Sequence, residues 1–298
     1  TLANTINPSM GNESPTSFKP GDLTNEETQI QADFTYDFNE YILAFGASYL
    51  DESYEISEGG VDSYFAGPYA TSDPWGFCDG DAASAAGLAV IGTGSTLNCA
   101  DSDDAVYTVV GVGSNGFPGY SPDYSGTYSR DSYAVYTDIS GDITDELFAQ
   151  AAIRYEDYSD FGSEVVYKVA GIYQINDEIA VRSSYGTGFR APTPGQQGTT
   201  NVSTRLPDGF PVATGLFPAG GDVAQALGAE ELLPEKSTNF TLGLTASFGD
   251  LTLTADYYNI KLEDRLYSVS TRDVSTTVVT DPDADGYDAY QNYLALSG

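Results

Sequence analysis

The chain has 298 residues, with 44 acidic side chains against 11 basic ones, a net charge of −33 and no histidine. So large a negative charge argues against nucleic acid as a partner, because binding it depends on Lys and Arg neutralising phosphates. The lack of histidine excludes Ser-His-Asp and Cys-His catalysis and every His-ligated metal centre, so we expect neither an enzyme nor a resident cofactor.

Apolar residues make up 41% of the chain, yet no run approaches the roughly 20 apolar residues that a membrane-spanning helix needs. Two classes remain: a soluble β protein, and a membrane β-barrel, whose strands are individually too polar to register as hydrophobic segments. The acidity itself suits either solubility in a salty medium or cation binding on an exposed face.

Eight segments alternate apolar and polar residues with the period of two that is typical of strands. In the first, Ile30, Phe34 and Phe38 share one face, and Asp33 and Asp37 lie on the other. Each segment has about 9–13 residues, the length that a tilted membrane strand requires. In chain order they are 30–38, 41–49, 130–140, 145–157, 164–174, 178–188, 237–248 and 251–263.

The connections between these segments alternate in length. A soluble sandwich has no reason to collect its long loops at one end, whereas an outer-membrane barrel has short periplasmic turns and long extracellular loops. The pattern therefore predicts an all-β, antiparallel transmembrane β-barrel with long extracellular loops. The short turns are 39–40, 141–144, 175–177 and 249–250, the long connections are 51–129, 189–236 and 264–298, and 158–163 is intermediate.

The longest connection, 51–129, contains 12 Asp or Glu residues and no Lys or Arg. Connections of this length in compact folds are usually functional, so we expect it to face a ligand or to cover a pore. It also holds both cysteines, Cys78 and Cys99. Their close spacing, in a Gly/Asp/Ser setting without nearby metal ligands, predicts a disulfide formed in an oxidising compartment, with two free thiols as the alternative.

Four strings of residues resemble the barrels of TonB-dependent outer-membrane receptors. They occur in that family's order and at its usual separations, and four ordered strings are far more specific than one. The resemblance is clearest over residues 130–266. Its residues are Arg154 and Tyr155 in the first string; Gly186, Gly188, Phe189, Arg190 and Pro192 in the second; Pro234, Glu235 and Ser237 in the third; and Asp256, Tyr257 and Tyr258 in the fourth.

The resemblance implies a bacterial outer-membrane barrel of about 22 strands with a plugged lumen, surrounded by outer-membrane lipid. It also implies a periplasmic energy-transducing partner of the TonB type. The sequence shows no plug domain, no energy-coupling TonB box and no closing aromatic-ended strand. We therefore expect residues 1–298 to form one partial barrel domain of about eight strands, from which the plug and the C-terminal strands are absent.

The resemblance further implies structural roles for several of these residues. Gly186 and Gly188 would relax their strand as it leaves the membrane, and Pro192 would end its pairing. For Arg190, a salt bridge within the wall is favoured over a ligand contact. Glu235, just before a strand, is likewise interpreted as structural.

The segment that begins with Asp281, Asp283 and Asp285, followed by Gly286, matches the first half of a calcium loop. The twelfth position is Asn292 rather than the bidentate Glu. The pattern predicts either a weak extracellular calcium site or a solvated, Asp-rich loop, of which the solvated loop is the better match.

Taken together, these features favour active uptake of a scarce small-molecule or oligosaccharide ligand. Because acidic loops repel anions, the charge favours a carbohydrate or another neutral or cationic nutrient over an anionic ferric siderophore. One alternative is a passive porin-like or small eight-stranded barrel, which predicts a full gene without an upstream plug. Another is a secreted β-rich adhesin, which predicts extraction into buffer without detergent.

Overall fold

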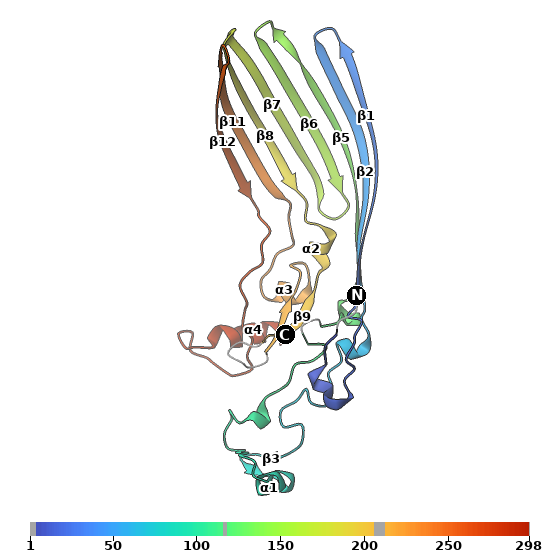
Figure 1. The fold of residues 1–298 in the computed structure, drawn as a ribbon, viewed down its shortest axis with the longest axis vertical. Coiled ribbons are helices and arrows are strands. Elements are labelled where there is room, and N and C mark those ends of the chain that lie inside the picture. Colours follow the sequence, from blue (N-terminus) through green and yellow to red (C-terminus); the bar gives the residue numbers. More distant parts are fainter. Residues whose placement is uncertain (1–3, 116–117, 206–211, 298) are drawn as a thin grey trace. The chain divides into compact units, whose positions relative to one another are not determined.

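A computed structural model describes residues 4–115, 118–205 and 212–297 of the chain (Figure 1). Eight strands form one sheet in which each strand pairs with its neighbours in the sequence. This arrangement confirms the predicted antiparallel all-β architecture, because each predicted segment coincides with a strand of this sheet apart from residues 145–146 and 178, which lie in turns. In sheet order the strands are β1 (Asp22–Phe38), β2 (Tyr41–Ser57), β5 (Gly126–Thr144), β6 (Leu147–Tyr158), β7 (Gly162–Asn176), β8 (Ile179–Arg190), β11 (Glu235–Phe248) and β12 (Leu251–Glu263).

Tight turns join the strands in pairs at one end of the sheet, at 39–40, 145–146, 177–178 and 249–250 (Figure 1). Asn39 and Gly249 supply the positive φ angles, 54° and 60°, that tight hairpin turns require. The long connections leave from the opposite strand ends, as the turn pattern predicted. The strand order is linear, so β1 and β12 are edge strands and the sheet is part of a barrel wall that does not close on itself.

Several boundaries differ from the prediction. β1 begins at Asp22 rather than at residue 30, and the β7–β8 turn lies at 177–178 rather than at 175–177. The turn expected at 141–144 lies instead at 145–146, because the β5–β6 register shifts between Asp142 and Thr144. The Thr144 hydroxyl then accepts hydrogen bonds from the backbone N–H groups of Glu146 and Leu147, at 3.3 and 3.2 Å, and fixes the reversal there. The connection expected over 51–129 is shorter, because backbone pairing carries β2 to Ser57 and starts β5 at Gly126, where apolar alternation no longer marks a strand.

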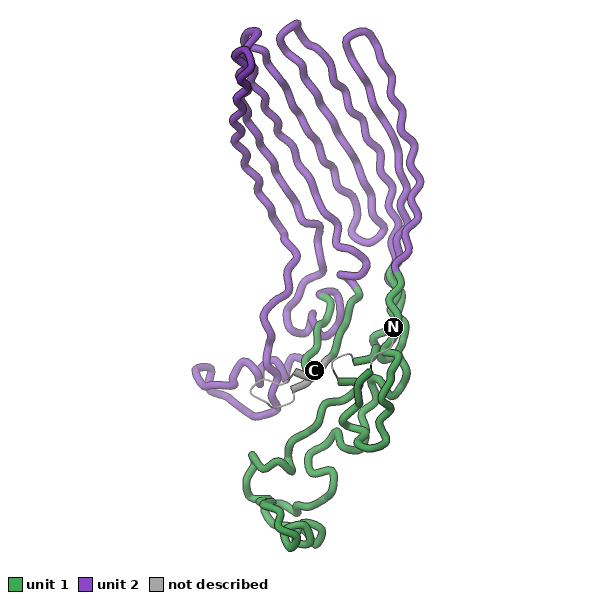
Figure 2. The backbone as a smooth tube through the Cα atoms, viewed as in Figure 1, with its two compact units in different colours: residues 1–24, 54–127, 198–218 green, residues 25–53, 128–197, 219–298 purple. Residues whose placement is uncertain are grey.

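The chain divides into two compact units, coloured separately in Figure 2. Unit 1 comprises residues 1–24, 54–127 and 198–218, and unit 2 comprises 25–53, 128–197 and 219–298. Unit 2 contains most of the sheet, together with the helices α3 (Asp222–Ala226) and α4 (Tyr287–Ser297), and the short helix α2 (Pro194–Gly198) ends at the boundary between the units.

Unit 1 contains short elements held by polar contacts. The buried Asn7 amide donates to the backbone carbonyls of Asp62 and Phe65, at 3.0 and 2.9 Å, and so fastens two segments far apart in the sequence. Its elements are η1 (Pro8–Glu13), η2 (Val61–Ser63), β3 (Cys78–Asp79), β4 (Ala82–Ala83), α1 (Ala85–Gly92), η3 (Ala105–Tyr107), η4 (Pro122–Tyr124), β9 (Asn201–Arg205) and β10 (Val212–Leu216).

The large sheet has almost no hydrophobic core of its own. Among the described apolar side chains of its strands, only Ile56 and Ala134 are buried, whereas most of the large ones are exposed. Within the described residues, none of the helices is both long and apolar enough to cross a membrane.

Candidate functional site

The strand register gathers apolar side chains on one face of the sheet. Ile139, Ala151, Val169, Tyr185 and Phe240 lie in a row across five neighbouring strands. The four large ones are between 37% and 56% exposed. Exposing such surface to water costs about 25 cal/mol per Å², so this face requires an apolar environment. Lipid satisfies that requirement for the outer face of a membrane barrel.

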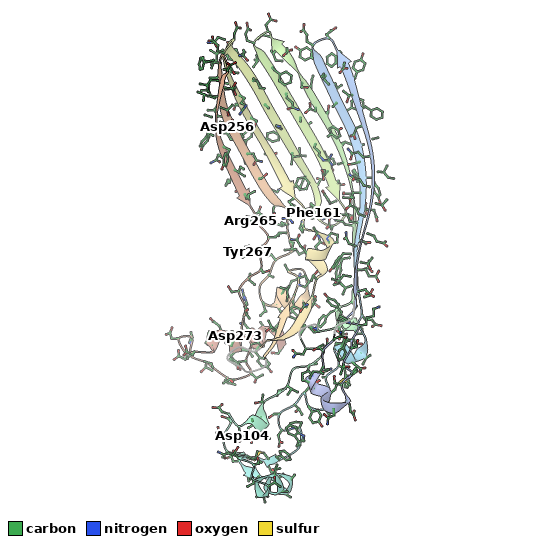
Figure 3. The ribbon with its side chains drawn as sticks, viewed as in Figure 1. Asp104, Phe161, Asp256, Arg265, Tyr267 and Asp273 are labelled. Atoms are coloured by element: carbon green, nitrogen blue, oxygen red, sulfur yellow. A yellow bond between two sulfur atoms is a disulfide. The ribbon has the colours of Figure 1, made fainter. Side chains whose placement is uncertain are left out.

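The opposite face of the sheet carries charged and hydroxyl side chains that pair across strands. Arg182 on β8 makes two hydrogen bonds of 2.7 Å to the carboxylate of Asp256 on β12. Asp256 is labelled in Figure 3. The pair spans β11, where Gly243 is in register with both residues. A Cβ at Gly243 would collide with both side chains, so glycine is what allows the ion pair to form.

A second contact on the polar face crosses a glycine in the same way. The Tyr136 hydroxyl on β5 donates to Asp33 on β1 at 2.7 Å, and a Cβ at Gly46 on the intervening β2 would collide with both. In each case a side chain reaches over the middle strand of three. The polar face is therefore fixed by cross-strand contacts rather than by packing against another layer.

Arg130, near the start of β5, is the most enclosed charged side chain of this face, with 7% of its side chain exposed. Its guanidinium donates to Glu52 at 2.8 and 2.7 Å and to the main-chain carbonyl of Pro192. It also lies 3.7 Å from Asp160 and 5.1 Å from the centre of the Tyr158 ring. Arg130 thus joins β2, β5, the β6–β7 turn and the residues after β8.

Two of the four family-like strings meet at Arg130. The Tyr158 ring stacks on Phe161 at 4.6 Å and meets the edge of Phe189 at 5.9 Å, and Pro192 is fully buried. In the first string Arg154 forms an ion pair with Glu156, which also accepts a hydrogen bond from the Tyr158 hydroxyl. These two strings therefore form one structural cluster at the strand ends.

Sequence reasoning did not identify Arg130, because its partners Glu52 and Pro192 are 78 and 62 positions away. One signal could have found it. Arg130 is the only Lys or Arg between Lys19 and Arg154, in a stretch rich in carboxylates. An isolated base among many acids is a natural candidate for an enclosed ion pair.

Arg190 and Glu235 are in register at the ends of β8 and β11 and form an ion pair at 3.7 Å. Glu235 also accepts a hydrogen bond of 2.8 Å from the backbone N–H of Leu266, beyond β12. The Arg190 side chain is 67% exposed, so the pair leaves one side of the guanidinium open to solvent.

The remaining residues of the four strings occupy strand positions on both faces. A Cβ at Gly186 would lie 3.0 Å from the carbonyl oxygen of Tyr167, and one at Gly188 would lie 2.8 Å from the Ser237 hydroxyl. Pro234 is buried immediately before β11.

Tyr155 and Tyr257 lie on the apolar face, paired with Val165 and Leu242 respectively, whereas Tyr258, 70% exposed, pairs with Thr241 on the polar face.

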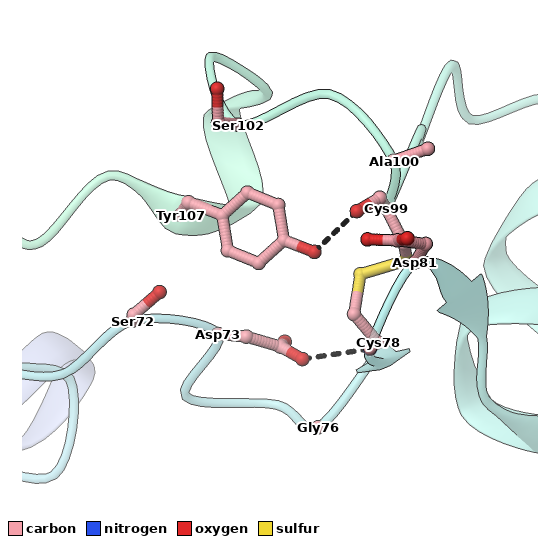
Figure 4. A pocket seen from close by; sticks show the side chains of 10 residues that line it. Ser72, Asp73, Gly76, Cys78, Asp81, Cys99, Ala100, Ser102 and Tyr107 are labelled. Carbon is pink, nitrogen blue, oxygen red and sulfur yellow. Dashed lines mark hydrogen bonds between the residues drawn. A yellow bond between two sulfur atoms is a disulfide. The ribbon is translucent and has the colours of Figure 1, made fainter.

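In unit 1, Cys78 and Cys99 form a disulfide with a Cα–Cα distance of 5.6 Å, which confirms the predicted bond. The disulfide lines an open cavity of about 620 Å³ (Figure 4). Asp73, Asp81 and Tyr107 also line this cavity, together with Ser72, Gly76, Gly80, Ala100 and Ser102.

Hydrogen bonds between side chains and the backbone stabilise the cavity wall. The Asp73 carboxylate accepts from the N–H groups of Phe77 and Cys78, at 2.8 and 2.7 Å, and the Tyr107 hydroxyl donates to the carbonyl of Cys99 at 2.7 Å (Figure 4). Burial, reinforced by the charges of Asp73, Asp81 and Asp104, raises the pKa of Tyr107 above its usual value. The phenol is therefore neutral at physiological pH.

The aspartates of the calcium-like segment are not brought together as a site. The Asp281 carboxylate accepts from the backbone N–H of Asp283 at 3.1 Å, a local turn contact. Within the described parts of the chain, no group of three or more His, Cys, Asp or Glu side chains is placed to hold a metal ion.

The family model described as "TonB dependent receptor-like, beta-barrel" matches residues 2–295. The chain belongs to the TonB-dependent receptor β-barrel family. Membership explains the combination of an exposed apolar face, a paired polar face and long connections at one end of the sheet. No curated protein matches the sequence.

Several solved structures of TonB-dependent receptors resemble the chain. The siderophore receptor PirA from Acinetobacter baumannii is 14% identical, with 82% of this chain and 27% of that chain covered and a TM-score of 0.46. A mutant of the ferric enterobactin receptor PfeA from Pseudomonas aeruginosa, in complex with enterobactin, is 11% identical, with 84% and 29% covered and a TM-score of 0.50. The chain thus spans less than a third of these receptors. The likeness to the enterobactin receptor shows the fold alone.

Proposed function

We propose that the chain supplies part of the wall and loops of a TonB-dependent receptor, which imports a small ligand across the bacterial outer membrane and catalyses no reaction. The observation that carries this proposal is the single-layer sheet. Its apolar face is exposed along its whole width, and the family model covers nearly the entire chain. A sheet without a second layer is stable where lipid covers one face and the rest of a barrel supplies the missing edges.

The proposed partners follow from the family. Lipid surrounds the apolar face, and a periplasmic TonB-type protein supplies energy through parts of the receptor outside this chain. For the ligand, the acidic connection between β2 and β5 favours a neutral or cationic molecule, such as a carbohydrate, over an anionic chelate. The receptors named above bind siderophores, so the two ligand classes are best separated by experiment.

The test uses the full-length receptor in its own bacterium. After cell fractionation we expect it in the outer membrane and extractable only with detergent, and we expect a photo-crosslink from its N-terminal region to the TonB-type protein. Recovery in buffer without detergent, or a lack of any crosslink, would exclude the proposal. Receptor-dependent accumulation of maltohexaose or of ferric enterobactin, each with and without a protonophore, then separates a neutral from an anionic ligand. Uptake that persists with the protonophore would indicate a passive channel.

A further inference from the structure

We propose that the disulfide-closed segment 72–107 forms a binding site for a small organic cation, between the carboxylate of Asp81 and the ring of Tyr107. The inference rests on the proposed function, because it names the chemistry of a ligand that the receptor would capture at its outer loops. The cavity volume, about 620 Å³, falls within the range of small-molecule sites.

The walls of this cavity are built to keep their shape. The Cys78–Cys99 disulfide closes the segment, and the backbone N–H of Asp73 donates to Val106 at 3.0 Å across its base. The Ser84 hydroxyl donates to Gly76 at 2.6 Å and so fixes the turn that precedes α1. A rigid cavity loses little entropy when a ligand binds, which is the main advantage of a preorganised site.

The carboxylates around the cavity differ in what they already bind. Asp73 accepts from two backbone N–H groups, and Asp104 accepts from those of Asn98 and Val106 at 2.8 and 2.9 Å. Asp81 is exposed at the rim, and no described residue forms a hydrogen bond or ion pair with its carboxylate. Since residues 51–129 contain no Lys or Arg, its charge has no counterpart within that connection.

An aromatic ring beside a carboxylate favours an organic cation over a metal ion. Ca²⁺ takes 6–8 oxygen ligands, whereas the described residues hold no group of three or more metal-ligating side chains. An ammonium group instead binds the electron-rich face of an aromatic ring. Figure 4 shows the ring of Tyr107 and the carboxylates of Asp73 and Asp81 around one opening.

Three aromatic rings, which could also bind a cation, lie in or next to the same segment. Trp75, the only tryptophan of the chain, is 55% exposed. Its ring stacks on Phe77 at 5.6 Å and lies tilted against Tyr69 at 5.7 Å. Gly76, which lies between Trp75 and Phe77 in the sequence, lines the cavity itself. The two rings therefore flank a residue of the cavity lining in the sequence.

The test is a calorimetric titration of the detergent-solubilised full-length receptor with choline and with 3,3-dimethylbutan-1-ol, which has the same shape without the charge. We expect choline to bind and the alcohol to bind at least about tenfold more weakly. Asp81→Asn should weaken choline binding by about threefold or more, and Tyr107→Leu should do the same. Asp103→Asn, an exposed carboxylate of the same segment outside the cavity, should leave binding unchanged.

Equal binding of the two probes, no binding of choline, or equal losses in Asp81→Asn and Asp103→Asn would each overturn the proposal. Asp81 is exposed, so its substitution does not threaten folding, and heat-modifiable migration on SDS gels verifies the fold of every variant. The titration needs no energy source. If choline does not bind, the crosslink to the TonB-type protein can still form, so only the cation site is excluded. If the crosslink is lost, the titration still tests the cation site, so only the proposed function is excluded.

Discussion

The enclosed Arg130 offers the sharpest test of how the polar face is stabilised. Replacing it with Gln removes the cation that Glu52 and Asp160 share, and their side chains are only 20% and 19% exposed. The substitution also removes the hydrogen bond to the carbonyl of Pro192 and the contact with the Tyr158 ring. Glu52 would then lose its ion-pair partner, and among the described residues Asp160 would keep only the hydrogen bond of 2.6 Å from the Gln197 amide.

Removing one partner of a buried ion pair costs about 3–5 kcal/mol. Because Glu52 and Asp160 retain some solvent, we expect the lower end of that range, about 3 kcal/mol, for Arg130→Gln. The matched control is Arg182→Gln, whose ion pair with Asp256 is 45% and 49% exposed. Exposed pairs contribute about 0.2–1 kcal/mol, so the control should lose much less.

The assay is urea unfolding of the full-length receptor refolded into detergent, followed by heat-modifiable migration. Adding Glu52→Gln to Arg130→Gln should recover part of the loss, because the enclosed carboxylate that lost its ion-pair partner is then replaced by a neutral amide. Equal destabilisation by Arg130→Gln and Arg182→Gln, or no recovery in the double variant, would refute this account of the cluster.

Three further predictions concern the sheet and the loop. Gly243→Ala should destabilise the receptor by about 1–3 kcal/mol in the same unfolding assay, because a Cβ there collides with the ion pair that crosses it. Gly171→Ala, whose nearest Cβ contact is at 3.4 Å, is its control and should change stability far less. Cys99→Ser should raise protease cleavage within 73–107 while the barrel stays heat-modifiable, since the lost disulfide contributes about 2–4 kcal/mol locally. Val169→Arg on the apolar face should reduce outer-membrane assembly, at a cost of about 2–4 kcal/mol, whereas Ala170→Arg on the polar face should be tolerated; equal assembly would contradict the assignment of faces.

The strands were predictable because each of them alternates apolar and polar residues, and this pattern can be recognised within a single segment of the sequence. Their ends were not, because β2 and β5 continue through polar residues such as Glu55 and Ser129, which pair through the backbone and leave no apolar pattern. The disulfide followed from two cysteines with no competing chemistry. Arg130 was missed because its contacts depend on how distant strand ends meet, which no local pattern records.

The distribution of charge in this chain bears on the proposed function. Basic side chains of the strands are largely neutralised in place, while the connection between β2 and β5 carries carboxylates without any base. A ligand that approaches this connection therefore meets a negative electrostatic field. Exchanging the acidic residues of that loop should alter the rate of ligand capture more than barrel stability. The basic strand residues that form ion pairs with carboxylates are Arg130, Arg154, Arg182, Arg190, Lys236 and Lys261.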